Sequence, residues 1–185
     1  MSMKEAGNLL SRVTGKELRF YSTYDFGRQK DENNLSVIID DEEEARNLVL
    51  NIRPELSEGL VTFVGTTKWY GDERHSGVEL VIGEGDSQFD ILRLARTDAL
   101  NYGMETEDLI QRLKEIQEQH QIQIQIFQAE SDTLWFDLNG HIGDLSGLCE
   151  DLYDFCPDVV DQNLGSMEDL EAFVEVMRQV YLWWD

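Results

Sequence analysis

Basic residues are scarce in this chain: 15 lysines and arginines stand against 38 aspartates and glutamates among 185 residues, a formal net charge of −23. Residues 131–185 contain 13 acidic residues and a single basic one, Arg178. Such a surface repels phosphate backbones and anionic lipid, whereas nucleic-acid-binding proteins need a basic footprint. We therefore expect no direct nucleic-acid binding and no membrane attachment. The acidic charge has two interpretations, which are solubility and a docking face for a basic partner.

Cysteine, proline and long apolar runs are also scarce. The chain has 2 cysteines and 2 prolines. Cys149 and Cys156 lie in a segment with helical periodicity, at a spacing that separates their Cα atoms by about 10 Å, too far for a disulfide. The apolar runs are shorter than the roughly 20 residues that cross a bilayer, and the first residues lack a signal-peptide pattern. We expect a soluble cytoplasmic protein with reduced thiols.

The N-terminal third predicts a small α/β extension. Apolar spacing indicates a helix over residues 4–14, strands over 17–22 and 35–40, and a second helix that begins near Asp40. The segment "IRPEL" at 52–56 interrupts this pattern. We place a domain boundary there, so that residues 1–56 form the extension and residues 57–185 a separate α+β domain.

The rest of the chain predicts alternating strands and helices. Apolar runs at 60–67 and 78–83 have strand length, and residues 88–99 show helical spacing, although a strand over "FDILRLA" remains an alternative. A clearer helix follows from Thr106, which is expected to cap it. "QIQIQIF" then alternates with the period of a strand and precedes "TLWFDLN", its expected hairpin partner.

Two further helices and the final strand complete the pattern. Asp144 is expected to cap one helix that Pro157 ends, and Ser166 to cap the last helix. "DVVD" at 158–161 predicts a short extended segment between them, and "VYLWW" predicts the last strand. From residue 78 onward this order matches a ferredoxin-like split βαββαβ core with an appended C-terminal helix and strand. The predicted fold class is α+β.

The terminal tryptophans raise a choice between packing and binding. In a strand, Val180, Leu182 and Trp184 face one side, and Tyr181 and Trp183 face the other. Both tryptophans therefore cannot share one face. We expect structural packing of one of them in the core, with an aromatic binding platform as the alternative.

No familiar catalytic motif is present. "GEGDSQ" at 83–88 lacks the third glycine of a dinucleotide fingerprint, and P-loop, zinc-protease and hydrolase patterns are missing. His75, His120 and His141 are scattered and expected at the surface. Cys149 lies on an apolar helical stripe and is expected to be buried, although a Cys–His pair formed only in the fold stays open. The sequence thus predicts no catalytic residue, no metal site and no cofactor.

The stretch "LARTDALNYGM" gathers Arg96, Asp98, Asn101 and Tyr102 near a helix end. An arginine close to an aspartate is more typical of a structural charge pair than of a catalyst. A polar site that includes these side chains is the alternative.

The stretch "DLYDFCPDVVDQ" spaces four aspartates every three or four residues: Asp151, Asp154, Asp158 and Asp161. Carboxylates could bind Mg²⁺ or Ca²⁺, but the glycine and spacing of an EF-hand loop are missing. The pattern favours a solvated acidic rim.

Several long segments carry a family resemblance: "GTTKWYGDE", "GVELVIG", "SQFDILRLARTDALNYGMETEDLI", "DLYDFCPDVVDQ" and the terminal "VYLWWD". Over residues 60–185 the chain resembles an uncharacterised bacterial domain-of-unknown-function family whose members end on the same tryptophan pair and aspartate. The resemblance implies a small bacterial cytosolic protein and supplies no reaction. Its signature positions that are candidates for binding are Trp69, Asp72, Arg96, Asp98, Asn101, Tyr102, Asp158, Asp161, Gln162, Trp183 and Asp185, and the signature also includes Cys156, Pro157 and Trp184.

The sequence supports two functional hypotheses. The first is a non-enzymatic acidic protein that docks or neutralises a basic protein partner, as an immunity protein or an inhibitor does. The alternative is a small-molecule or divalent-metal-binding enzyme that uses the Arg96, Asp98 and Asn101 group with the group of Asp158, Asp161 and Gln162. The alternative requires that both groups line one pocket.

Overall fold

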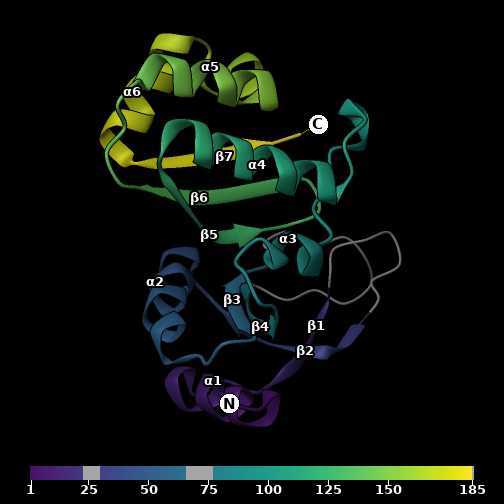
Figure 1. Cartoon of the computed structure of the whole chain (residues 1–185). Coiled ribbons are helices and arrows are strands. Elements are labelled where there is room, and N and C mark those ends of the chain that lie inside the picture. The colour runs from purple at the N-terminus through teal and green to yellow at the C-terminus, as the bar shows by residue number, and fades with distance from the viewer. Residues whose placement is uncertain (23–29, 66–76, 185) are drawn as a thin grey trace. The chain divides into compact units, whose positions relative to one another are not determined.

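A computed structural model describes residues 1–22, 30–65 and 77–184 of the chain. It confirms the α+β class, with helices and a mixed sheet. The chain divides into two compact units (Figure 1). The first consists of Met1–Arg96 and Phe127–Ser131, and the second of Thr97–Ile126 and Asp132–Asp185.

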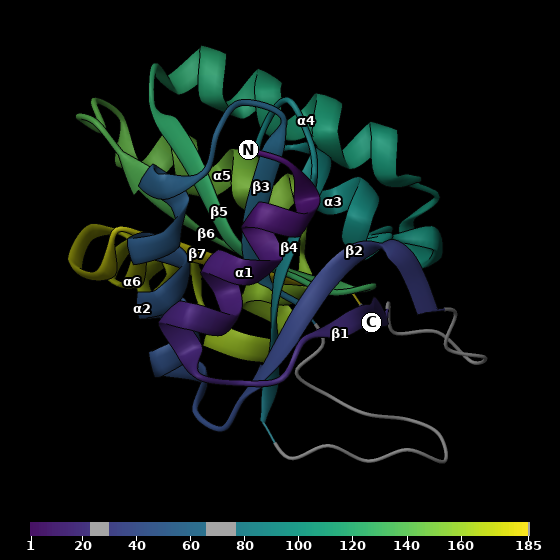
Figure 2. The same cartoon turned by 90° about the horizontal axis from the view of Figure 1, so that it is seen from below.

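In its described residues the first unit has four neighbouring strands, in the order β1-β2-β4-β3. Its elements are α1 (Met3–Thr14), β1 (Arg19–Ser22), β2 (Lys30–Ile39), α2 (Glu42–Ile52), the 3-10 helix η1 (Arg53–Glu55), β3 (Leu60–Val64), β4 (Val78–Glu84) and α3 (Asp90–Ala95). These strands pair antiparallel, and Val64 of β3 makes a parallel bridge to Gln128. Helix α1 lies along β2 and β4 (Figure 2), and α2 packs against β3 and β4.

Local signals in the sequence set the ends of these helices. Ser2 and Glu5 form a capping box at the start of α1, and Gly15 ends it with φ 67°. Asp41 caps α2 by accepting a hydrogen bond from the Glu44 amide, one residue from the expected start. Residues 90–95 form the short helix α3, so the strand alternative for that segment is wrong.

The second unit combines the strands β5, β6 and β7 with the α-helices α4, α5 and α6 and two shorter helices, η2 and η3. Its elements are η2 (Leu100–Tyr102), α4 (Thr106–His120), β5 (Gln123–Ala129, shared with the first unit), β6 (Thr133–Asn139), α5 (Leu145–Phe155), the π-helix η3 (Val159–Leu164), α6 (Met167–Met177) and β7 (Gln179–Trp183). Strand β6 lies between β5 and β7 and pairs antiparallel with β7. Helix α5 contacts both α4 and α6.

Most signals of the second unit are confirmed. Asp144 caps α5 and Ser166 caps α6, each by accepting a hydrogen bond from a backbone amide three residues ahead. Glu105, and not Thr106, caps α4. The buried side chains of Ile122, Ile124 and Ile126 confirm the period-two pattern around β5.

The predicted extended segment at 158–161 is wrong. Asp158 adopts helical backbone angles, and Val159–Leu164 form the π-helix η3 that ends at Gly165 with φ 92°. The pair Val159 and Val160 suggested a strand, but both side chains are buried by a helical turn instead. The ferredoxin-like split arrangement is therefore not confirmed, because the strand that would have completed it is helical.

Trp184 confirms the packing prediction for the terminal strand. The Trp184 residue is 3% exposed, and its Nε1 donates to the Phe155 carbonyl at 3.2 Å. Its ring packs edge to face against the Phe155 ring, with 5.3 Å between the ring centroids. Trp183 points to the other side and is half-buried. The buried set Val180, Leu182 and Trp184 thus forms the core face of the chain end.

The expected domain boundary after residue 56 stays a prediction. Within the described ranges, none of the helices combines the length and apolar composition that a membrane span requires.

Candidate functional site

Two signature stretches of the second unit meet at a buried aspartate. Tyr102 on η2 donates its hydroxyl to Asp158 Oδ2 at 2.6 Å, and Gln162 Nε2 on η3 donates to Asp158 Oδ1 at 2.6 Å. The Asp158 residue is only 5% exposed, whereas the Tyr102 residue is 39% exposed. The hydrogen bond between Tyr102 and the buried carboxylate of Asp158 therefore joins residues 56 positions apart in sequence.

The turn between α5 and η3 places this carboxylate. Pro157 follows the end of α5, and its carbonyl accepts the amides of Val160 and Asp161 in the first turn of η3. Cys156 Sγ donates to the Trp183 carbonyl at 3.1 Å and ties the turn to β7. The signature segment "CPD" thus connects the terminal strand to the buried aspartate.

The contact with Asp158 changes the acidity of the tyrosine. The hydrogen bond to Asp158, assisted by burial and by the negative charges of Asp158 and Asp161, raises the pKa of Tyr102 to about 12. Tyr102 therefore stays a neutral hydroxyl donor throughout the physiological pH range. Its role in this arrangement is to satisfy the buried carboxylate, not to ionise.

The expected acidic rim is only half correct. Asp154 and Asp161 are exposed, but Asp158 is buried and the Asp151 side chain is 18% exposed. Asp161 accepts a hydrogen bond from the Tyr153 hydroxyl at 3.3 Å. Asp151 faces α4 while Asp154 is exposed on the same helix, and Asp158 and Asp161 follow after α5 has ended.

The other predicted site residues have varied positions and exposures. Arg96 ends α3 in a left-handed conformation with φ 56° and belongs to the first unit, with an exposed side chain. Asn101 lies beside Tyr102 on η2 and is exposed, and Asp98 is half-buried. The remaining candidates Trp69, Asp72 and Asp185 lie outside the described residues.

Sequence reasoning missed a second polar cluster, between α4 and α5. Asp151 Oδ2 lies 2.7 Å from His120 Nε2 and 2.7 Å from Gln119 Nε2, and Arg112 Nη2 lies 2.9 Å from Asp151 Oδ1. The His120 side chain is 8% exposed, so the prediction of a surface histidine is wrong for this residue. No local pattern signals this cluster, because its members come from two helices 31 residues or more apart.

A pocket of about 410 Å³ opens beside this cluster. It is lined by Gln119, His120, Gln121, His141, Gly143 and Asp144. Within the described residues, no three histidine, cysteine, aspartate or glutamate side chains lie close enough together to hold a metal ion.

Asp151 is expected to make the protein less stable as the pH falls into the acid range. Partial burial alone would raise the pKa of Asp151, but the hydrogen bonds and charges of His120 and Arg112 outweigh it and lower the pKa below the usual range. A lowered pKa stabilises the fold above about pH 4, and this contribution disappears as pH falls through the folded-state value. We expect Asp151→Asn to cost about 1–2 kcal/mol at pH 7 and progressively less below about pH 4.

Urea unfolding at several pH values measures this difference. Asp154→Asn is the matched control, because Asp154 lies one helical turn on and is exposed. Its effect is expected to be near zero at every pH. A penalty for Asp151→Asn that stays constant from pH 7 to about pH 3.5 would contradict the assigned role.

The negative charge is concentrated in the second unit. This unit contains 19 acidic and three basic residues. Of the basic residues, Arg112 binds Asp151, and Arg178 Nη2 donates to the Gly140 carbonyl. Much of the acidic surface of this unit therefore lacks basic residues of its own to balance it.

This imbalance predicts stabilisation by salt. Repulsion between like charges destabilises the compact state at low ionic strength, and added ions screen it. We expect the melting temperature to rise between about 10 and about 300 mM NaCl, as measured by differential scanning fluorimetry. A flat or falling curve would mean that the carboxylates are too dispersed to repel one another.

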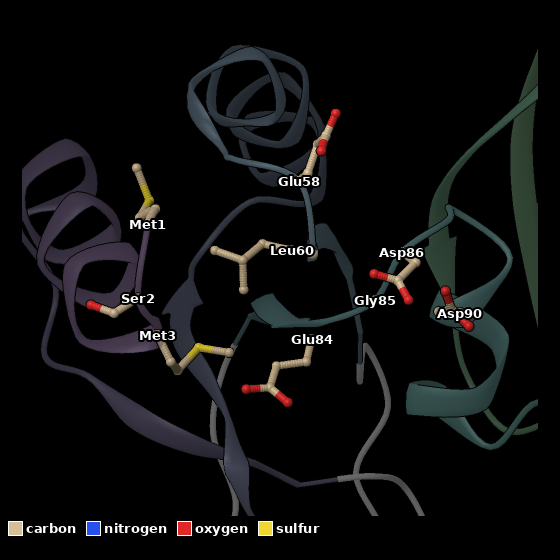
Figure 3. Close-up of a pocket in the computed structure, with 10 residues that line it drawn as sticks. Met1, Ser2, Met3, Glu58, Leu60, Glu84, Gly85, Asp86 and Asp90 are labelled. Atoms are coloured by element: carbon tan, nitrogen blue, oxygen red, sulfur yellow. The ribbon is translucent and has the colours of Figure 1, made fainter.

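The first unit has its own acidic pocket of about 620 Å³ (Figure 3). Glu58, Glu84 and Asp86 surround it, and Met1 and Met3 lie at its opposite side. A fourth carboxylate of its lining, Asp90, forms an ion pair with Arg93. Its lining, taken over the described residues, contains none of the candidate binding residues from the signature.

Fold and charge together define the class of this protein: an α+β protein whose more acidic unit contains a buried, hydrogen-bonded aspartate. A family model described as "Domain of unknown function (DUF4253)" matches residues 79–185, and the chain belongs to this family. The match confirms the resemblance to a domain-of-unknown-function family. No curated protein and no solved structure gives a significant match to the chain.

Proposed function

We propose that this chain is a non-enzymatic, acidic interaction protein that docks or neutralises a basic protein partner, as immunity proteins and inhibitors do. The observation that carries the proposal is the charge of the second unit, with 19 acidic residues against three basic ones. Complementary charge speeds encounter with a basic partner and suppresses wrong partners. The same charge disfavours nucleic acid as the partner.

The signature cluster supports a surface role. Both oxygens of Asp158 accept short hydrogen bonds, from Tyr102 and Gln162, so this carboxylate fixes the positions of both side chains. Two neighbours, Tyr102 and Gln162, and the nearby Asp161 remain exposed. A rigid internal support beneath exposed polar and aromatic groups suits recognition of another protein. The buried free thiols, Cys149 and Cys156, are in keeping with a reducing cytoplasm.

Affinity purification from the native cell tests this proposal. The tagged chain is incubated with lysate at about 50 and about 500 mM NaCl, and retained proteins are identified. An acidic protein of similar size and net charge is the control. The proposal expects a basic protein that is retained specifically at low salt and that, once purified, binds with a defined stoichiometry. Retention of the same basic proteins by the control, with none specific to this chain, would overturn it.

A second candidate function is supported by the contact between Tyr102 and Asp158. This contact joins the two stretches that the enzyme hypothesis requires, and it buries a carboxylate. The part of this candidate site that lies within the second unit, Asp98 and Asn101 with Asp158, Asp161 and Gln162, would be stabilised by a small-molecule or divalent-metal ligand. Thermal melts with Mg²⁺, Mn²⁺ and a metabolite library test it, with Asp161→Asn as comparison. Absence of any shift in the wild-type protein would count against this candidate.

A further inference from the structure

An exposed apolar and aromatic surface lies next to the buried aspartate of the second unit. The Leu100 residue is 65% exposed and the Tyr102 residue 39% exposed, both on η2. They are two positions apart on this short helix, and Tyr102 contacts Asp158 directly. We use the name η2–η3 surface for four residues: Leu100 and Tyr102 on η2, Asp161 on η3, and Tyr153 at the end of α5, which contacts Asp161.

Asp161 gives this surface its charge. Its carboxylate accepts the Tyr153 hydroxyl at 3.3 Å, and its negative charge also raises the pKa of Tyr102. Asp161 is also the sequence neighbour of Gln162, which shares the Asp158 carboxylate with Tyr102, so the backbone of η3 brings it close to Tyr102 as well as to Tyr153. It is exposed, and the Tyr153 hydroxyl donates to its two oxygens at 3.3 and 3.5 Å, long contacts that leave acceptor capacity on both.

The supporting contacts fix the aromatic part of the surface. The Tyr102 hydroxyl is held by Asp158 at 2.6 Å, and Asp158 is held in turn by Gln162. A tyrosine that is oriented in this way loses little conformational freedom when a partner binds. Asp158 is accordingly a positioning residue, whereas Tyr102 and Asp161 are the groups that a partner can reach.

We propose that the η2–η3 surface docks an arginine side chain presented by a basic protein. This inference rests on the proposed function and names the chemistry of the partner. A guanidinium group binds a carboxylate through two parallel hydrogen bonds and stacks on a tyrosine ring, and its aliphatic stem covers apolar surface such as Leu100. An ammonium group is a compact, strongly hydrated charge that matches this combination less well. Charge complementarity therefore selects a basic partner, and the tyrosines select arginine over lysine.

The test compares two blocked peptides, hexa-arginine amide and hexa-lysine amide, by calorimetric titration at about 50 mM NaCl. We expect the arginine peptide to bind at least about threefold more tightly. Asp161→Asn is expected to weaken the arginine peptide about tenfold, equivalent to about 1.4 kcal/mol, and to remove the preference between the peptides. Leu100→Ser is expected to weaken arginine binding about threefold while leaving the fold intact, because Leu100 is an exposed residue.

Glu118→Gln is the matched charge control. Glu118 is exposed in the second unit near the far end of α4, roughly 18 Å along the helix from the end that follows η2. It removes one negative charge, as Asp161→Asn does, and is expected to change affinity less than about twofold.

The outcomes separate this inference from the proposed function. Equal affinity for both peptides, or equal weakening by Asp161→Asn and Glu118→Gln, overturns the arginine surface. In that case binding of both peptides still agrees with an acidic docking protein. If a specific basic partner is found by affinity purification but Asp161→Asn binds it normally, the location is wrong and the function stands.

Discussion

Replacement of Trp184 by alanine is expected to cost about 3–5 kcal/mol of the free energy of unfolding, because a fully buried aromatic side chain leaves a cavity that the surroundings fill only in part. Trp184 also donates to the Phe155 carbonyl and contacts the Phe155 ring, so its loss loosens α5 against β7. This cost is a large fraction of the roughly 5–15 kcal/mol by which domains of this size are stable.

The neighbouring tryptophan is the matched control. Trp183 points to the opposite side of β7 and is half-buried. We expect Trp183→Ala to cost about 1–2 kcal/mol by urea unfolding, less than the cost at Trp184. Deletion of residues 181–185 removes Leu182 as well as Trp184 and is expected to abolish the near-UV circular dichroism of the chain. A cooperative, near-native transition in the truncated protein would contradict the structural role of this strand.

Replacement of Asp158 by alanine is expected to cost about 2–4 kcal/mol. The carboxylate accepts two short hydrogen bonds, each worth about 1.5–3 kcal/mol when one partner is charged, and the two contributions are not fully additive. Asp158→Asn keeps the shape and one acceptor, and is expected to lose about half as much. Chemical denaturation followed by circular dichroism measures both variants.

Asp161→Ala provides the comparison for this prediction. Asp161 lies three residues further on and is exposed, with one hydrogen bond at 3.3 Å. Its replacement is expected to change stability by less than about 0.5 kcal/mol. Equal losses at Asp158 and Asp161 would show that the network around Asp158 is no more important to folding than a surface carboxylate. Together the two variants separate the supporting residue of the η2–η3 surface from its exposed charge.

The candidate site was predicted only in part because contact partners are not visible in a linear pattern. The signature contained Tyr102, Asp158 and Gln162, but nothing in their spacing shows that a tyrosine and an aspartate 56 positions apart share a hydrogen bond. The Asp151 cluster was missed for the same reason. Its histidine lies at the end of α4 and its aspartate within α5, so only the packing of those helices joins them.

At residues 158–161 a local pattern was present but predicted the wrong structure. Two adjacent valines predict extended structure by their preference for strands. In the folded chain, Pro157 and the burial of Val159, Val160 and Asp158 favour a helical turn that extends α5 in a new direction. Tertiary burial outweighed local preference, and the ferredoxin-like topology inferred from a strand here lost its support.

The sequence by itself determined the charge, the α+β class, most helix starts and the alternation that puts Trp183 and Trp184 on opposite sides of the terminal strand. These features follow from composition, capping residues and alternation, which act over a few neighbouring residues. Only the tertiary structure decided which carboxylates are internal and which face solvent. The reason is that a carboxylate becomes tolerable in the interior only when distant donors, such as Tyr102 for Asp158 or His120 and Arg112 for Asp151, are brought to it by the fold.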